Sequence, residues 1–523
     1  MPFAGALRLF TLGSLALLCR SQQAPTFTIA GHVVRHLDQR AIKGARVSLT
    51  MVKDIQRQIS AITSENGGFS FQGVPAGKYQ LRVTDHGTSQ LYQETENYST
   101  AIVTGPGLDS EHILFALDSP ATLSGTIVDE ENDPVPQATV YLFTHSVVSG
   151  KNQTRSGGQT NTDTAGALHF RHLSPGTYYV AVVGRPWYAQ NMSHSPSQPA
   201  THSELDVAYP TTYYAGSTSP DSATPLKLEE GAKAEIQLIL HAVPSLHIGV
   251  DGLGETDHGV NVSVTQLGPG GITIQLPVGF AGSELVGIAP GNYLLSLQDP
   301  SQARGSSEPQ AVSLTGDTTL HLDNQIKTSI SGKVISASDT SAGLAVLLMN
   351  EATSRHYAET VHADGTFEFQ RASAGHYRIA LANAPDTYPA KVEVRGAIYT
   401  NGELEVPKGA QVELIITAGH GLSKVEGIVV QDKKPFAGAM VLLIPQDLHH
   451  GKAIVRDQSD SDGTFTLNSV KPGRYSLVAI DDGRGLAYAE QGTITPYLEH
   501  APVVDVPLAN NNVNIEVEVQ HRQ

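Results

Sequence analysis

The sequence predicts an all-β protein, a tandem array of about five β-sandwich domains that follows a signal peptide. Three observations support this fold class. One motif of two short strands recurs along the 523 residues. Short apolar strands follow one another at turn-marked spacings of about ten residues. No long apolar period of about 3.6 residues indicates a helix outside the first twenty residues.

The recurring motif begins with a turn and ends with an aromatic strand. Its copies occupy residues 64–83, 162–183, 285–297, 362–382 and 461–479. In the last copy, SDGTFTLNSVKPGRYSLVA, an Asp-Gly turn precedes Phe465 and Leu467, which alternate with polar residues as in a strand. After a second turn, a tyrosine opens the next apolar strand: Tyr79, Tyr178, Tyr293, Tyr377 and Tyr475. The motif therefore predicts a β-hairpin with an aromatic residue in the core.

Strands with one early glycine open four of the repeats, at residues 29–34, 123–128, 330–335 and 425–430. A turn with Pro, Gly or Asp follows each opening strand. A second apolar strand comes next, as in LSGTIVDEENDPVPQATVYL. Short strands at this spacing, separated by turn residues, are typical of β-sandwiches.

The repeat spacing of about 85 to 120 residues matches the usual size of a domain. The 50 Gly and 29 Pro residues suit a turn-rich all-β chain, and 40% hydrophobic residues can supply each unit with a core. We expect the third unit to be degenerate and the second to carry an aromatic insertion. The predicted sandwich domains cover residues 24–120, 121–243, 244–327, 328–422 and 423–523.

The charge balance excludes several partners. The formal net charge is -17, from 34 Lys and Arg against 51 Asp and Glu, and no basic cluster stands out in the mature region. Polyphosphate backbones would be repelled by such a field, so nucleic acid is not an expected partner. The same argument disfavours attachment to anionic lipid surfaces.

Residues 1–21 have the pattern of a secretory signal peptide, with one basic residue before an apolar run that is too short to span a bilayer. Cleavage after Ser21 would remove Cys19, the only cysteine. The alternative is a lipid anchor at Cys19, although Leu18 stands where lipoprotein signals place a small residue. We expect an exported protein, periplasmic, cell-surface or extracellular, with no membrane-spanning segment in the mature chain.

The opening strands and the turn motifs together resemble the carboxypeptidase regulatory-like domain, a transthyretin-like or Ig-like β-sandwich found in tandem in secreted bacterial proteins. The resemblance is carried by LSGTIVDEENDPVPQATVYL from Leu123, VEGIVVQDKKPFAGAMVLL from Val425, and the SDGTFTL and KPGRYSL motifs. It covers nearly the whole mature chain and is weakest in the third unit. In metallocarboxypeptidases this module is an accessory to the catalytic domain, so the resemblance implies a non-catalytic role. Related starch-binding-like folds suggest carbohydrate binding by analogy.

No residue pattern predicts catalysis, a cofactor or a metal site. The one H-x-x-E fragment, His356 and Glu359, is expected on a strand, where residues three apart point to opposite faces and cannot share zinc. The sequence has no HExxH, nucleophile-elbow or P-loop motif. Asp457, Asp460 and Asp462 leave a calcium loop open as an alternative, but their spacing breaks the EF-hand pattern and a turn is the expected role.

One aromatic-rich segment departs from the repeat pattern, at residues 185–216 in the second unit. Its aromatic residues, including the only tryptophan, are Trp187, Tyr188, Tyr209, Tyr213 and Tyr214. Flat aromatic faces suit sugar rings and equally suit a protein partner. These five residues are therefore the candidate ligand-binding site. The alternative is that the rings pin a long loop onto its own sandwich or onto the third unit.

Two functions from different classes fit these features. The first is a secreted, non-catalytic binding protein with a carbohydrate as the most plausible ligand, so a polysaccharide or a cell-surface protein is the expected partner. The second is a structural spacer or surface assembly protein with no small ligand. Neither function requires a cofactor.

Overall fold

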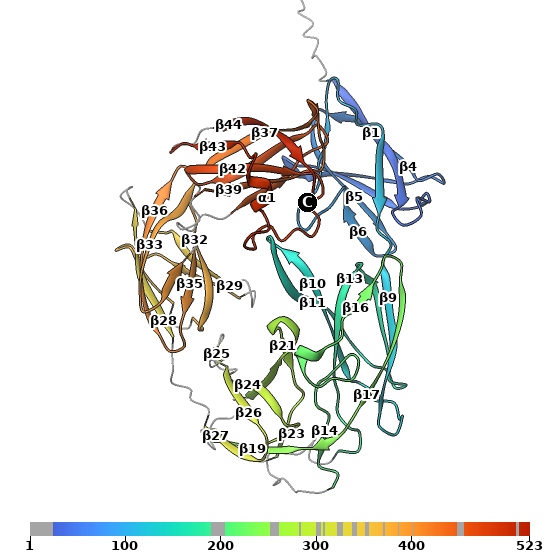
Figure 1. Cartoon of the computed structure of the whole chain (residues 1–523), viewed down its shortest axis with the longest axis vertical. Coiled ribbons are helices and arrows are strands. Elements are labelled where there is room, and N and C mark those ends of the chain that lie inside the picture. The colour runs from blue at the N-terminus through green and yellow to red at the C-terminus, as the bar shows by residue number, and fades with distance from the viewer. Residues whose placement is uncertain are drawn as a thin grey trace, which may run out of the picture.

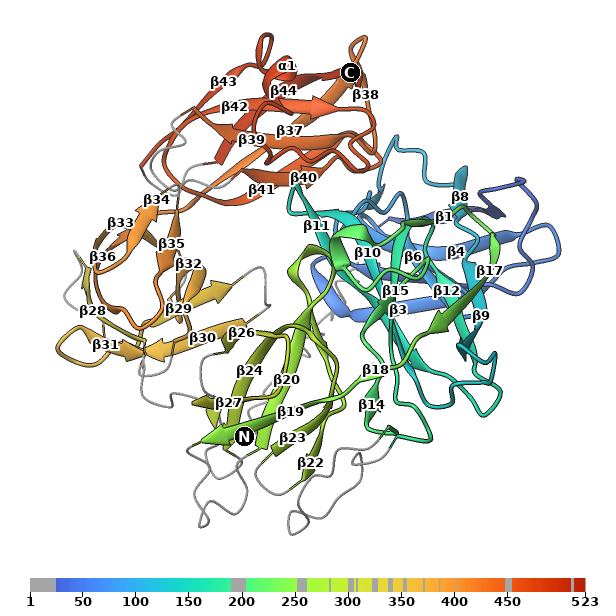
Figure 2. The same cartoon turned by 60° about the horizontal axis from the view of Figure 1, so that its bottom comes forward.

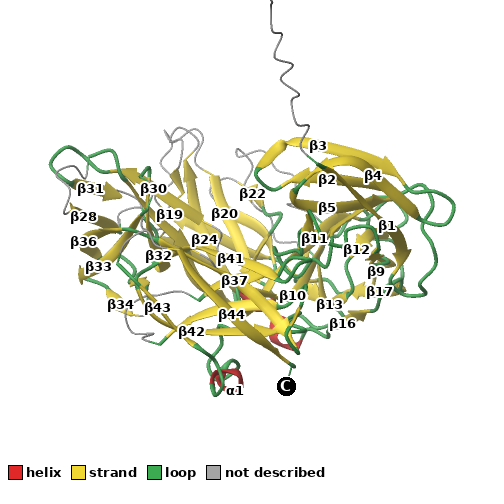
Figure 3. Ribbon diagram, turned by 90° about the horizontal axis from the view of Figure 1, so that it is seen from above, coloured by secondary structure: helices red, strands yellow, loops and turns green. Residues whose placement is uncertain are grey.

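The computed structural model confirms the all-β fold class, because strands dominate the described residues (Figure 3). In this part of the chain, helix is confined to α1 (Thr495–Leu498) and the 3-10 turns η1 (Pro220–Ser222) and η2 (Pro269–Gly271). The prediction of no helix was wrong for α1, whose four residues are too few to produce a helical period. None of these helices is long and apolar enough to cross a membrane. The structure describes residues 25–189, 204–251, 261–281, 284–299, 305–306, 309–321, 328–336, 342–350, 355–369, 372–384, 386–400, 402–446, 454–508 and 512–522.

The described strands form five groups with one shared topology, named sandwich 1 to sandwich 5 in chain order. In each, the opening strand pairs with an antiparallel neighbour and with the parallel last strand of its group. In sandwich 5 the opening strand also pairs with the two-residue strand β38 (Lys434–Pro435). The next long strand of the group lies between two antiparallel partners. The sequence repeat is therefore a repeat of strand order.

Sandwiches 1 and 2 lie in the N-terminal half of the chain. Sandwich 1 contains β1 (Thr26–Arg35), β2 (Arg46–Met51), β3 (Asp54–Ile62), β4 (Gly68–Pro75), β5 (Gly77–Asp85), β6 (Thr88–Leu91), β7 (Ile102–Thr104) and β8 (Ile113–Leu117). Sandwich 2 contains β9 (Ala121–Asp129), β10 (Thr139–Val148), β11 (Lys151–Asn161), β12 (Ala167–Leu173), β13 (Gly176–Val183), β15 (Thr212–Tyr213), β16 (Leu226–Leu228) and β17 (Lys233–Leu240). A separate two-stranded ladder joins β14 (Val207–Ala208) to β18 (Val243–Pro244).

The remaining three sandwiches repeat the arrangement. Sandwich 3 contains β19 (Leu246–Asp251), β20 (Asn261–Leu267), β21 (Thr273–Gln275), β22 (Gly279–Ala281), β23 (Glu284–Ile288), β24 (Gly291–Asp299), β25 (Gly305–Ser306), β26 (Gln310–Leu314) and β27 (Thr318–His321). Sandwich 4 contains β28 (Ser329–Ser336), β29 (Ala345–Asn350), β30 (Arg355–Thr360), β31 (Thr366–Phe369), β32 (Gly375–Ala382), β33 (Thr387–Arg395), β34 (Ile398–Thr400), β35 (Glu403–Val406) and β36 (Gln411–His420). Sandwich 5 contains β37 (Ser423–Gln431), β38 (Lys434–Pro435), β39 (Met440–Pro445), β40 (Val455–Gln458), β41 (Thr464–Val470), β42 (Gly473–Ile480), β43 (Val503–Val506) and β44 (Asn512–Gln520).

Alternating side chains give each sandwich its own apolar core. In β5, Tyr79, Leu81 and Val83 are buried, while Gln80 and Arg82 between them are exposed. This alternation is what a strand with one buried face requires.

The predicted hairpin is wrong in its pairing. The two strands of the repeated motif lie in different ladders, because β4 pairs with β1 whereas β5 pairs with β2. The same holds in sandwich 5, where β41 pairs with β37 and β42 with β39. The tight turn between the two strands carries the chain across the core. Both strands can then point apolar side chains at that core from opposite sides, which two strands of one hairpin could not do.

The motif tyrosines are buried in the core, as predicted. Each also donates a hydrogen bond from its phenol to the backbone carbonyl four residues earlier. In sandwich 5, Tyr475 donates to the Lys471 oxygen at 2.7 Å. The corresponding bonds of Tyr79, Tyr178, Tyr293 and Tyr377 are 2.9, 2.7, 2.5 and 2.6 Å long. The hydroxyl satisfies a carbonyl at the corner between the two strands, which explains why the repeat uses tyrosine rather than phenylalanine.

The early glycine of each opening strand lies where the parallel last strand approaches closely. A Cβ atom on Gly427 would lie 2.0 Å from the Ile515 carbonyl oxygen, and one on Gly31 would lie 2.0 Å from that of Ile113. A side chain at this position would push the two strands apart.

Sandwich 5 packs against sandwich 1, so the sandwiches follow one another around a closed circuit (Figures 1 and 2). We call the contact between them the clasp. It contains ion pairs from Lys78 to Asp460 and from Glu96 to Arg456, and a hydrogen bond of 2.8 Å from the Val103 amide to Ser461 Oγ. The Arg456 side chain is only 2% exposed. Such a polar contact resembles a transient protein interface rather than a domain core.

Further contacts hold the circuit together. At the turn between β10 and β11 of sandwich 2, the Gly150 carbonyl accepts from the Ala489 amide at 2.8 Å, and the Asn152 amide donates to Glu490 Oε1 at 2.8 Å. The Lys471 ammonium lies 5.5 Å from the ring centroid of Tyr388 in sandwich 4.

Candidate functional site

The predicted aromatic site begins directly after β13. The Trp187 side chain is 72% exposed. Its ring meets the half-buried ring of Tyr188 edge-on, with centroids 5.7 Å apart and an interplanar angle of 89°. Arg185 ties this point to sandwich 3, because its Nε donates to the Pro277 carbonyl at 3.1 Å. The indole is thus presented to solvent from a stretch of backbone that Arg185 anchors.

The other three predicted aromatic residues do not join this surface. Tyr209 is 6% exposed and lies in the core of sandwich 2, and Tyr213 is fully buried beside Ile274 of sandwich 3. Burial raises the pKa of both phenols. Tyr214 is half-buried against the sandwich 2 core. These rings therefore pack the segment onto sandwiches 2 and 3, as the alternative interpretation expected. Residues 190–203 of the insertion lie outside the described residues.

Acidic side chains lie near the Tyr188 phenol. Burial raises the pKa of this phenol, and the carboxylate of Glu130, followed by those of Asp129 and Glu131, adds to the effect. All three acids come from the end of β9 and the turn that follows it. Carboxylate oxygens near this phenol can accept hydrogen bonds from hydroxyl groups of a ligand.

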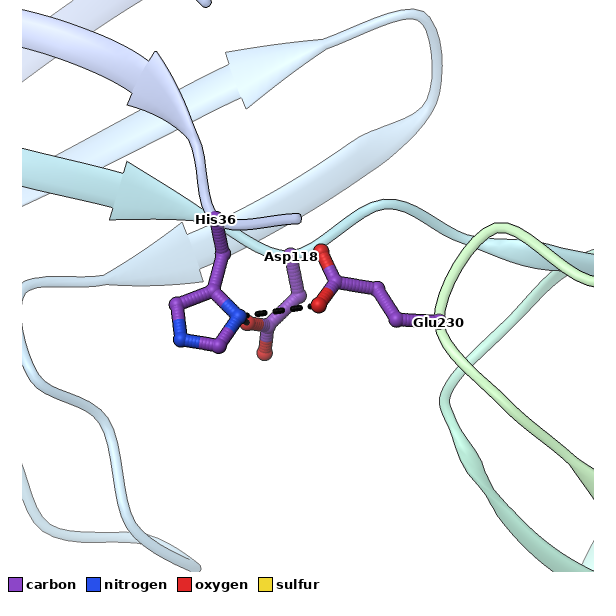
Figure 4. A group of neighbouring side chains, drawn as sticks. All are labelled: His36, Asp118 and Glu230. Carbon is purple, nitrogen blue, oxygen red and sulfur yellow. Dashed lines mark hydrogen bonds and ion pairs between the residues drawn. The ribbon is translucent and has the colours of Figure 1, made fainter. Parts of the chain in front are cut away.

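A second group of polar side chains lies at the junction of sandwiches 1 and 2 (Figure 4). His36 follows β1, Asp118 follows β8, and Glu230 lies in the turn between β16 and β17. The His36 Nδ1 atom is 2.8 Å from Glu230 Oε2 and 3.9 Å from Asp118 Oδ1. One ligand atom from each of the three side chains lies within 4.8 Å of the other two.

Backbone hydrogen bonds hold this group in place. The His36 amide donates to the Leu117 carbonyl at 2.9 Å. The Ser119 amide donates to Glu230 Oε1 at 2.7 Å, which leaves Oε2 directed at the imidazole. Burial alone would raise the pKa of Glu230, but the hydrogen bonds from His36 and Ser119 outweigh it and lower the pKa. Glu230 is therefore ionised at neutral pH.

No pattern in the sequence predicts this group. His36 and Glu230 are 194 residues apart and belong to different repeats. No motif spacing links them, because the parallel ladder of β1 with β8 and the turn before β17 bring them together. Only a prediction of contacts between sandwiches could have found it.

The residues considered for metal binding in the sequence have other surroundings. His356 and Glu359 lie on β30, and neither belongs to a group of three ligands among the described residues. Asp462 Oδ1 accepts hydrogen bonds from the Thr464 amide and hydroxyl, the turn role predicted for it. Asp460 pairs with Lys78 in the clasp.

Comparison with known proteins agrees with the fold. Residues 28–104, which span β1 to β7, match the carboxypeptidase regulatory-like domain family. No curated protein matches the chain. The chain is thus an all-β protein of repeated sandwiches, and its sandwich 1 is similar to the carboxypeptidase regulatory-like domain.

Several solved structures align with the chain at low similarity. The TIE protein of Bacillus anthracis is 10% identical, with 95% of this chain and 75% of that chain covered and a TM-score of 0.19. The minor pilin GBS52 of Streptococcus agalactiae is 14% identical, with coverages of 41% and 97% and a TM-score of 0.22. The major pilin subunit BcpA of Bacillus cereus is 11% identical, with coverages of 94% and 99% and a TM-score of 0.14. These scores are too low to assign a shared function.

Proposed function

We propose that this chain is an exported, non-catalytic binding protein that uses Trp187 and Tyr188 to contact a carbohydrate. The observation that carries the proposal is the exposure of Trp187. It is the one aromatic side chain in the exposed class among those that the structure describes. Tryptophan is usually well buried, so an exposed indole on an anchored segment needs a reason.

The surroundings of Trp187 favour a sugar over an apolar ligand. A pyranose presents C–H groups to the indole face and hydroxyl groups at its rim. The acids near Tyr188, foremost Glu130, can accept hydrogen bonds from those hydroxyls. Their negative charge, like that of the whole chain, disfavours an anionic ligand. A neutral polysaccharide is therefore the ligand class that we propose.

A glycan array tests this proposal with the full mature chain. We expect binding to one class of neutral glycans, and Trp187→Ala should weaken it at least tenfold, or about 1.4 kcal/mol. Ile398→Ala is the matched control, because Ile398 is also exposed, at 58%, but lies on β34 of sandwich 4. Binding to no glycan class, or binding that Trp187→Ala leaves intact, would contradict the proposal.

A surface assembly protein is the second candidate, and the free edge of sandwich 1 favours it. β3 pairs with β2, has no second partner among the described strands, and exposes Ile55 and Ile59. An unpaired edge with apolar side chains can add a strand from another protein. If this function holds, the protein should self-associate or capture a partner strand, and Ile55→Lys should abolish the association seen by analytical ultracentrifugation.

We also propose that each sandwich is a domain with the boundaries predicted from the repeats. The separate cores and the repeated strand order support this division. Limited proteolysis should release fragments that begin or end near residues 121, 244, 328 and 423. Cleavage within the strands of a sandwich, with the linkers intact, would contradict it.

Export rests on residues 1–21, which lie outside the described residues together with Cys19. We propose that the mature chain begins at Gln22 after cleavage behind Ser21. Mass spectrometry of the secreted protein should find this N-terminus. A mature chain that begins with a lipid-modified Cys19 would instead establish the anchored alternative.

A further inference from the structure

The group at the junction of sandwiches 1 and 2 has the composition of a metal site. It offers one imidazole nitrogen and two carboxylate oxygens, from His36, Asp118 and Glu230. Zinc and similar divalent ions bind this combination of ligands, at bond lengths of about 2.0 to 2.2 Å. Tetrahedral ligands at such lengths lie about 3.4 Å apart. The observed separations of 2.8 and 3.9 Å from His36 Nδ1 lie on either side of that value.

The charges of the group are not balanced by the protein itself. Among the described residues, no lysine or arginine forms an ion pair with Asp118 or Glu230, and His36 is the one basic partner of both. A protonated imidazole can supply one positive charge for two carboxylates. Its single Nδ1 proton can donate well to only one of them. One negative charge is therefore left at a junction where Glu230 is largely buried.

We propose that His36, Asp118 and Glu230 bind a divalent transition-metal ion, with zinc as the favoured ion. Two positive charges would neutralise both carboxylates while the imidazole binds in its neutral form. The Ser119 amide on Glu230 Oε1 and the Leu117 carbonyl on the His36 backbone hold two of the ligands in position. Such supporting hydrogen bonds orient the ligands of known metal sites. Partial exposure of His36 and Asp118 leaves room for water as a further ligand.

The position of the site gives the ion a structural role. Two ligands belong to sandwich 1 and the third to sandwich 2, so a bound ion would fix the orientation of the two sandwiches. This inference is independent of carbohydrate binding, since Trp187 is not part of the site.

Isothermal titration calorimetry with zinc chloride tests the inference on the full mature chain, produced without a histidine tag and stripped with a chelator. We expect one saturable site per chain. Glu230→Gln, Asp118→Asn and His36→Ala should each weaken it at least tenfold. The matched control is His112→Ala, because His112 forms an exposed pair with Asp109 at 2.9 Å that lacks a third ligand. This variant should bind zinc like the wild type.

Cobalt provides a second measurement that a purely structural effect would not change. The wild type with one equivalent of cobalt should show the visible absorption of a coordinated ion. The Glu230→Gln variant should lack this absorption. Its melting temperature without metal should stay close to that of the wild type. Absence of a saturable site, or zinc binding that survives in all three ligand variants, would overturn the inference. The second outcome would assign the zinc to other histidines on the surface.

Discussion

Asp457→Asn should stabilise sandwich 5 at alkaline pH. Burial raises the pKa of the Asp457 carboxyl from 3.8 to about 6, and the charge of Asp460 adds to the effect, although the Thr466 and Gln458 amides and Lys78 oppose it. The folded protein therefore binds this proton more tightly than the unfolded chain. Stability linked to Asp457 is full below about pH 4 and is lost as the pH rises through about 6. A pKa difference of roughly two corresponds to a loss of about 3 kcal/mol.

Asparagine keeps an oxygen that can accept the hydrogen bond of the Thr466 amide, which is 2.7 Å long, and it has no charge to bury. Hydrogen exchange of the β41 amides, followed by mass spectrometry at about pH 5 and about pH 8, measures the local stability. After correction for the intrinsic exchange rate, β41 of the wild type should be less stable at the higher pH. In the variant, the stability of β41 should differ much less between the two pH values. An Asp457→Asn protein that is less protected than the wild type at the higher pH would refute the reasoning.

Three further changes test the fold. Tyr475→Phe removes the hydroxyl that satisfies a corner carbonyl and should cost about 1 to 2 kcal/mol in calorimetric unfolding; no loss would contradict the corner role. Gly427→Ala places a Cβ 2.0 Å from a carbonyl oxygen and should lower the melting temperature. Gly316→Ala is the control and should leave the melting temperature unchanged, because a Cβ at Gly316 meets no atom within 4 Å. Arg456→Ala leaves Glu96 unpaired in the clasp and should cost about 3 to 5 kcal/mol. Solution scattering should then show a larger radius of gyration, and an unchanged radius would contradict the clasp.

The sequence was sufficient for features that depend on local pattern. The repeated motif predicted the strands around Phe465 and the buried tyrosines, because alternation and turn chemistry are properties of a few consecutive residues. Strand pairing was predicted wrongly, since the partner of β4 is β1 and lies outside the motif. Local residues do not encode which distant strand completes a ladder.

The candidate sites show the same limit of local sequence pattern. An exposed aromatic and a buried one look alike in sequence, so Trp187 and Tyr209 were grouped although one faces solvent and the other lies in the core. The group of His36, Asp118 and Glu230 could not be predicted, because it exists only where two sandwiches meet. The clasp was missed for the same reason.

The fluorescence of Trp187 tests the proposed function most directly, because this residue is the only tryptophan in the chain. With its side chain 72% exposed, the free protein should emit at the red end of the tryptophan range and be quenched readily by acrylamide. A neutral polysaccharide that binds should shift the emission to the blue and protect it from acrylamide, with saturation at the concentration that saturates binding. Emission that stays unchanged while the polysaccharide binds elsewhere, or that is already blue-shifted in the free protein, would contradict the account.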